Sequence, residues 1–125
     1  MNNLTITRKK TFRAILLPYF IVLSPVSKEK FMQEHHLDGD LCGIDMMGQS
    51  ISRMDVNILE SIGIAISNGE TKEINLTDND KYIFVSTIDG SLSNEININE
   101  IKTNNLLITT RGGLKTVCYP FIKEQ

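Results

Sequence analysis

The hydrophobic residues of this chain fall into short segments that are rich in β-branched side chains and separated by polar turns. The first strong segment covers residues 12–23 and is apolar at almost every position, which predicts a strand buried on both faces. Pro18 interrupts this segment. Because proline cannot donate to a β-ladder, it indicates an edge position or a bulge.

A short helix is expected directly after this strand, over residues 25–36. Ser24 and Pro25 form a cap and first-turn pair, and Gly39 is expected to stop the helix. The side chains expected to face inward are Val26, Phe31 and Met32.

Residues 54–66 fit two patterns. Every second position is apolar, with Glu60 as the single exception, which is the period of a strand. A helical stripe also fits, with Asp55 as its cap and Asn68–Gly69 as its stop. The density of β-branched residues favours the strand, and the helix remains the alternative.

The rest of the chain alternates short apolar segments with turn dipeptides. Asn68–Gly69, Asp89–Gly90 and Gly112–Gly113 supply the positive φ angles of tight hairpins. They separate the segments KEINL, KYIFVSTI, EINI, LLITT and LKTVCYPFI. This order predicts an antiparallel C-terminal meander.

Together these elements predict an α+β fold. We expect one or two helices packed on a mainly antiparallel sheet of about five to seven strands, with a C-terminal hairpin meander. No repeat, low-complexity tract or linker divides the 125 residues, so residues 1–125 are expected to form a single domain.

The composition is that of a globular protein with an aliphatic core. Hydrophobic residues make up 41% of the chain and charged residues 22%, and with no Trp and 6% aromatics, isoleucine supplies most of the core. Cys42 and Cys118 are far apart and match neither a disulfide framework nor a zinc spacing. We expect two reduced, buried thiols.

The N-terminal region resembles a signal peptide in outline only. Basic residues at positions 8–13 precede an apolar run, but Pro18 interrupts the run and no small-residue cleavage site follows it. The run is also too short to cross a bilayer, which takes about 20 residues as a helix. We expect a core strand of a cytoplasmic protein that does not contact a membrane, and secretion remains the alternative.

The net charge of −2 hides an uneven distribution. Residues 1–30 carry six Lys and Arg against one Glu, whereas residues 31–100 carry thirteen acids against three bases. The last 25 residues are basic again, with four Lys and Arg against one Glu. An acidic middle of this size repels nucleic acid and attracts basic proteins.

Residues 34–48 gather the most reactive side chains, yet no known type of site fits them. His35 and His36 are adjacent and therefore point apart on a helix or a strand. As a calcium loop, the segment has Cys42 where an Asp or Asn ligand is needed, and Gln49 where the bidentate Glu is needed. We therefore expect no metal, no cofactor and no cysteine nucleophile, and an enzyme is the less favoured class.

Phosphate-binding motifs are also absent. The segment TRGGLK, residues 110–115, has glycines and bases but no helix N-terminus after it. A basic patch formed with Arg8, Lys9 and Lys10 could touch nucleic acid, but the acidic middle and the lack of interleaved exposed aromatics argue against this function.

Size, charge asymmetry and the missing catalytic motif favour a small acidic protein-binding protein. The expected type is a bacterial immunity protein or antitoxin whose acidic face docks on a basic partner such as a nuclease toxin. A small enzyme or ligand-binding protein with an unmarked pocket is the alternative, and a secretion chaperone or oligomeric scaffold is the second. The expected contact residues are Asp38, Asp40, Asp45, Glu70, Glu73, Asp78 and Asp80.

Overall fold

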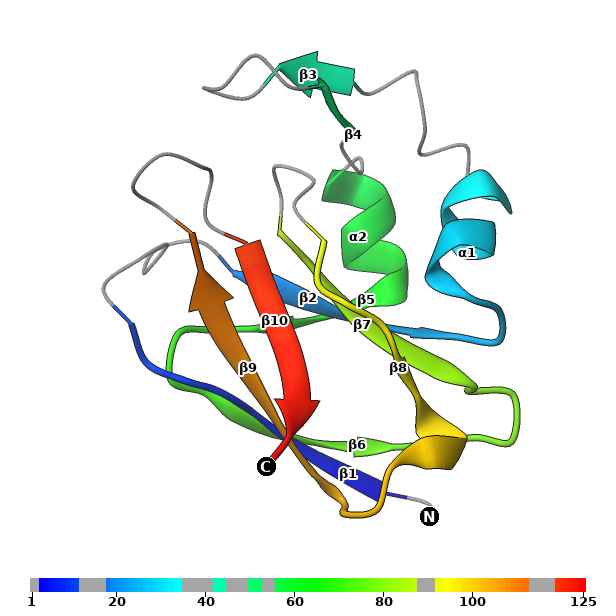
Figure 1. Cartoon of the computed structure of the whole chain (residues 1–125), viewed down its shortest axis with the longest axis vertical. Helices are drawn as coiled ribbons and strands as arrows, with labels where there is room; N and C mark the ends of the chain where they lie inside the picture. The colour runs from blue at the N-terminus through cyan, green and yellow to red at the C-terminus, as the bar shows by residue number, and fades with distance from the viewer. Residues whose placement is uncertain are drawn as a thin grey trace.

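The computed structural model describes residues 3–11, 18–34, 42–44, 50–52, 56–87, 92–112 and 119–125. It shows two four-stranded sheets and two short helices (Figure 1). The elements in chain order are β1 (Asn3–Arg8), β2 (Tyr19–Ser24), α1 (Lys28–Glu34), β3 (Cys42–Ile44), β4 (Ser50–Ser52), α2 (Val56–Ile62), β5 (Gly63–Ile66), β6 (Thr71–Asn75), β7 (Tyr82–Thr87), β8 (Ile96–Asn97), the 3-10 helix η1 (Ile98–Glu100), β9 (Asn105–Arg111) and β10 (Tyr119–Glu124).

The strands form two main sheets and a small ribbon. Sheet 1 has the order β10-β9-β1-β6, and its central pair β1 and β9 is parallel. Sheet 2 has the order β5-β2-β7-β8 and is antiparallel throughout. Strands β3 and β4 pair only with each other. The fold is thus broadly α+β and mostly antiparallel, but the prediction of one sheet of five to seven strands is wrong.

The main core lies between the two sheets and is almost entirely aliphatic. Sheet 1 contributes inward side chains from β1, β6, β9 and β10, and sheet 2 contributes them from β2, β5 and β7. Its buried members are Leu4, Ile6, Tyr19, Ile21, Ile66, Ile74, Ile83, Val85, Ile98, Ile101, Leu106, Ile108 and Ile122. Seven of these thirteen are isoleucines from strands, which confirms the expected β-branched core.

A second core covers the other face of sheet 2. Phe20, Val22 and Phe84 point away from sheet 1 and pack against Phe31 and Met32 of α1 and Leu59 of α2. The rings of Phe31 and Phe84 meet edge to face at 5.4 Å between centroids. Sheet 2 is therefore a middle layer. Because β2 and β7 are buried on both faces, both are apolar over most of their length, and β7 ends in the buried Ser86 and Thr87.

The β2 prediction holds for the described part of residues 12–23. Tyr19–Ser24 is a strand buried on both faces. Pro18 lies immediately before it, and β2 is an inner strand between β5 and β7, so the edge position predicted from Pro18 is wrong. The first half of the predicted strand, residues 12–17, lies outside the described residues.

Helix α1 confirms the expected helix and its buried side chains Phe31 and Met32, with Val26 packed beside them. Its cap is different from the predicted one. Ser27, rather than Ser24, accepts hydrogen bonds at the helix start, from Phe31 N to its carbonyl at 2.8 Å and from Lys30 N to its Oγ at 3.4 Å. Ser24 is instead buried at the end of β2, where its hydroxyl bonds the backbone of Val26. The predicted stop, Gly39, is outside the described residues.

The preference for a strand over residues 54–66 is wrong for the first part and right for the second. Val56–Ile62 form helix α2, and Gly63–Ile66 form β5 directly after it. Leu59 of this helix is fully buried in the second core. A Cβ on Gly63 would lie 2.7 Å from the carbonyl oxygen of Leu59, so this glycine permits the abrupt change from helix to strand.

The predicted meander is right for two of its strand pairs and wrong for the rest. Strand β7 pairs antiparallel with β8, as the segment order predicted, but β6 pairs with β1, and β8 and β9 lie in different sheets. Strands β9 and β10 pair as expected, and Gly112 has the positive φ of 81° that the turn dipeptide predicted. Gly69 also has a positive φ, of 79°, but β5 and β6 on either side of it belong to different sheets. The Asn68–Gly69 turn is therefore a corner between sheets. Asp89–Gly90 lies outside the described residues.

Within the described residues, no helix is long and apolar enough to cross a membrane.

Candidate functional site

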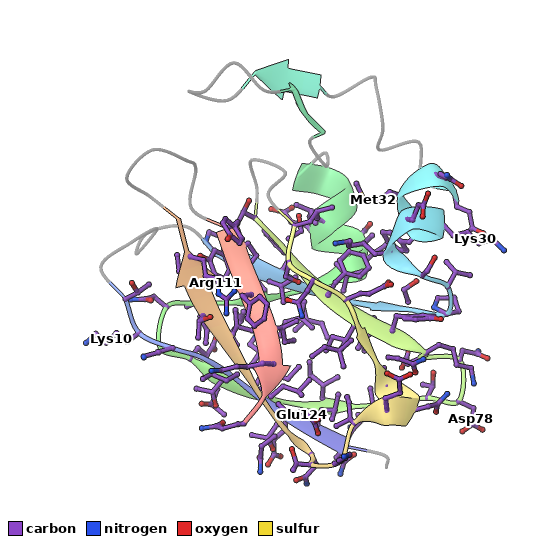
Figure 2. The ribbon with its side chains drawn as sticks, in the orientation of Figure 1. Lys10, Lys30, Met32, Asp78, Arg111 and Glu124 are labelled. Atoms are coloured by element: carbon purple, nitrogen blue, oxygen red, sulfur yellow. The ribbon has the colours of Figure 1, made fainter. Side chains whose placement is uncertain are left out.

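The structure places the described members of the predicted contact set along one sheet edge. Glu70 precedes β6, Glu73 lies within it, and Asp78 and Asp80 belong to the turn that follows (Figures 1 and 2). Residues 70–80 contain these four acids against Lys72 alone, a net charge of −3. Asp38, Asp40 and Asp45 lie outside the described residues, so their place relative to this edge is not given.

Two of the four acids shape the turns at the ends of β6. The Glu70 carboxylate accepts the N–H of Ser67 at 2.9 Å, and Glu70 N–H returns a bond to the Ser67 carbonyl at 3.0 Å. Asp80 repeats this arrangement with Thr77, at 2.9 Å to its N–H and 3.1 Å to its carbonyl. These two carboxylates hold the backbone on either side of β6 while keeping their negative charge at the edge.

The other two acids are fully available to a partner. Glu73 is exposed on β6 opposite Thr5 of β1, and Asp78 is exposed at the turn beyond it. Exposed carboxylates accept charge-assisted hydrogen bonds from Lys and Arg, which are about twice as strong as neutral ones.

The backbone of β6 has an open hydrogen-bonding side. Arg8 N–H donates to the Glu70 carbonyl at 2.9 Å, whereas Thr5 N–H donates toward β9, to the Asn104 carbonyl at 2.8 Å. The backbone hydrogen-bonding groups of β1 alternate between its two neighbouring strands. The N–H and C=O groups of Lys72 and Ile74 in β6 therefore point toward β1. The N–H and C=O groups of Thr71, Glu73 and Asn75 point away from sheet 1, and no described strand pairs with them.

The opposite edge of sheet 1, β10, is protected by contrast. The Asn94 side chain imitates a neighbouring strand: its Oδ1 accepts Ile122 N–H at 3.0 Å and its Nδ2 donates to the Ile122 carbonyl at 2.8 Å. Pro120 has the same orientation two residues earlier and offers no N–H. These features stop another chain from pairing with β10, whereas among the described residues β6 has the Lys72 and Glu73 charges as its only protection.

A recess lies at the end of the β6 edge. Its volume is about 300 Å³, and it is lined by Leu76, Thr77, Asp78, Asp80, Lys81, Ile98 and Asn99. Two predicted acids thus share one concave surface with residues of η1, which come from a distant part of the sequence. The sequence offered no signal for the η1 side of this recess, because Ile98 and Asn99 join it only through the tertiary fold.

Most of the reactive stretch at residues 34–48 is not described by the structure. His35, His36 and the predicted acids of that stretch lie outside the described residues, as does Cys118, and Cys42 is described only by its backbone in β3. In the described part of the chain, no cluster of three or more His, Cys, Asp or Glu side chains could hold a metal ion.

Comparison with known proteins adds no function. No family model matches the sequence, and no curated protein does. Among solved structures, the fold is weakly similar to the membrane pore complex of Pneumolysin, with 11% identity and a TM-score of 0.29 over 99% of this chain and 24% of that chain. A likeness at this level establishes neither a shared fold nor a shared function.

Proposed function

We propose that this chain is a small protein-binding protein of the immunity or antitoxin type, which docks the acidic β6 edge on a basic protein such as a nuclease toxin. The observation that carries the proposal is the placement of four acids along one edge strand, β6, and its two turns. They are Glu70, Glu73, Asp78 and Asp80, and β6 pairs with β1 on one side and is open on the other. Acids spread over a segment of sequence become one continuous docking surface in this way.

The edge offers two kinds of recognition at once. The outward N–H and C=O groups of Thr71, Glu73 and Asn75 can pair with an extended segment of the partner, which is binding by strand addition. The exposed carboxylates of Glu73 and Asp78 select Lys or Arg side chains on that segment. Backbone pairing gives affinity without regard to sequence, so the charges supply the specificity.

The same geometry argues against self-assembly through this edge. If two copies paired antiparallel through β6 about its centre, Glu73 of one copy would lie beside Glu73 of the other. Like charges directly opposite on neighbouring strands are destabilising, and each segment carries a net charge of −3. A basic heterologous partner fits the edge better than a second copy.

The proposal is tested with a defined probe, an octapeptide of alternating Lys and Val, added to the ¹⁵N-labelled full chain. We expect saturable shifts and slower amide exchange at Thr71, Glu73 and Asn75, since these N–H groups would gain partners. An alternating Glu and Val peptide is the control probe and is expected not to bind.

Charge reversal gives the matched test. E73K/D78K should weaken peptide binding by roughly tenfold or more, because two charge-assisted contacts become repulsive. E34K/E60K makes the same change of net charge on exposed helical positions and should bind as the wild type does. Equal weakening by both variants, or shifts centred away from β6, would contradict the proposed edge.

The biological activity is tested by co-expression. A basic nuclease toxin encoded beside this chain should be neutralised by the wild type and by E34K/E60K, but not by E73K/D78K.

A further inference from the structure

A small cavity at the end of β1 has a lining unlike that of the recess beside β6. Its volume is about 160 Å³, and it is lined by Lys9, Lys10, Thr11, Thr109 and Thr110. Two lysines and three threonines thus line it, and none of these five residues is acidic. Figure 2 shows Lys10 and Asp78 on opposite sides of the molecule, so this cavity lies far from the exposed Asp78 end of the proposed protein-binding edge.

The parallel pairing of β1 and β9 creates this cavity. Lys9 N–H donates to the Ile108 carbonyl at 2.8 Å, which extends the ladder one residue past β1 and sets the lysines beside Thr109 and Thr110. Residues from opposite ends of the chain therefore form one polar pocket, a site that no sequence motif marks.

The lysine-bearing segment is held in place from its other side. Thr11 N–H donates to Asn68 Oδ1 at 3.0 Å, and Asn68 Nδ2 donates to the Thr11 carbonyl at 3.0 Å. The Lys10 side chain lies over Gly69, where an added Cβ would be in ordinary van der Waals contact at 3.6 Å. The backbone of residues 9–11 is thus held by the corner between the two sheets before a ligand arrives.

A buried cation lies beneath the cavity. Arg8 is fully buried, donates from Nη1 to the Ile66 carbonyl at 3.0 Å, and stacks 3.7 Å from the centre of the Tyr19 ring. Burial lowers the pKa of Arg8, but an arginine remains protonated in a protein. Its positive charge adds to that of Lys9 and Lys10 at this end of sheet 1.

Tyr19 connects this cation to the lining. Its hydroxyl lies 2.6 Å from Thr110 Oγ1, a short hydrogen bond. This bond joins Thr110 of the lining to the ring that stacks on the buried Arg8.

We propose that this cavity binds a single phosphate group, either as inorganic phosphate or as the terminal group of a small phosphomonoester. The lining supplies donors and positive charge, which is what a multiply charged oxyanion needs. Pockets for drug-sized ligands measure about 300–1,000 Å³, and 160 Å³ is roughly the share of five water molecules in the liquid, so the cavity suits one small anion.

Calorimetric titration and ¹H–¹⁵N NMR test this inference on the full chain. Inorganic phosphate and glycerol phosphate are each titrated against sodium chloride at the same ionic strength. We expect saturable binding of at least one phosphate compound, with shifts confined to residues 9–11 and 109–110. Binding of both identifies the phosphate group itself as the ligand, and binding of glycerol phosphate alone identifies a phosphomonoester.

Two pairs of variants locate the site. K9Q/K10Q should weaken phosphate binding by roughly tenfold or more, whereas K30Q/K102Q removes the same charge from exposed positions elsewhere and should bind within about twofold of the wild type. T110V removes the hydroxyl and should weaken binding, and T110S should restore it. The thermal unfolding of each variant shows that it is folded.

Three results would overturn the inference. One is equal binding of chloride and phosphate, and another is equal weakening by K9Q/K10Q and K30Q/K102Q. The third is tight, steeply salt-dependent binding of a single-stranded oligonucleotide without binding of either phosphate compound, which would identify a nucleic-acid surface instead. None of these results bears on β6, because the proposed protein-binding edge uses none of the five lining residues.

Discussion

Replacing Gly63 with alanine tests the account of the junction between α2 and β5. The new Cβ would lie 2.7 Å from the carbonyl oxygen of Leu59 and 3.1 Å from Cβ of Phe20. Both neighbours are held tightly, since Leu59 is fully buried and Phe20 is 4% exposed in the second core. The backbone of α2 or of β2 must therefore move to admit one methyl group.

The size of the effect follows from two opposing terms. Overpacking of this kind costs about 1–3 kcal/mol. The unfolded chain becomes less flexible when glycine is replaced, which returns about 0.4–1 kcal/mol. We expect a net loss of about 1–2 kcal/mol, which in a domain of this size lowers the melting temperature by about 4–8 °C.

Urea unfolding followed by circular dichroism gives the free energy of unfolding, and calorimetry gives the melting temperature. Gly63→Val serves as an internal comparison and should lose more stability than Gly63→Ala, because its side chain meets the same atoms with more volume. Unchanged or increased stability in Gly63→Ala would refute the steric argument, and so would a valine variant no less stable than the alanine one.

Three further predictions concern the edges of sheet 1. Asn94→Asp keeps the shape of the side chain but turns its donor to Ile122 into a carboxylate oxygen, so urea unfolding should show a loss of about 1–3 kcal/mol at neutral pH; unchanged stability would contradict the role of Asn94 at the β10 edge. Glu124 accepts hydrogen bonds from the N–H groups of Thr103 and Lys102, and these bonds lower the pKa of its carboxyl in the folded chain. The stability that Glu124 contributes is therefore fully present above its unfolded pKa of about 4.3. It is lost as the pH falls through the lower folded pKa. Glu124→Gln should therefore be less stable than the wild type at neutral pH and equally stable in strong acid, and a difference that persists in acid would show another cause. Raising the salt concentration from about 0.05 to 0.5 M should weaken binding of the Lys and Val peptide to β6 by roughly tenfold, measured by fluorescence anisotropy, and a salt-independent affinity would argue against charge selection.

Patterns within one segment predicted local structure well. The amphipathic stretch of α1 indicated its buried side chains, and the continuous apolar run of Tyr19–Ser24 indicated a strand covered on both faces. Each of these outcomes depends on the spacing of neighbouring residues, which the sequence displays directly.

Strand partners could not be predicted in this way. The same alternation fits β6 whether it pairs with β5, β7 or β1, and only packing between the two sheets selects β1. The Asn68–Gly69 dipeptide predicts a reversal of the chain with positive φ at Gly69. It does not predict whether the strands on either side belong to one sheet. Residues 56–62 show the same limit, because their isoleucines fit both periods, and in the folded chain they form a helix with Leu59 buried.

The candidate sites divide along the same line. The sequence by itself determined that residues 70–80 are acidic and that residues 8–10 are basic, because charge is a property of each side chain. Only the tertiary structure decided that the acids lie along an open edge, and that the lysines meet two threonines of β9 around a cavity. Strand order brings distant segments together through contacts between sheets, and such contacts have no period along the chain from which they could be predicted.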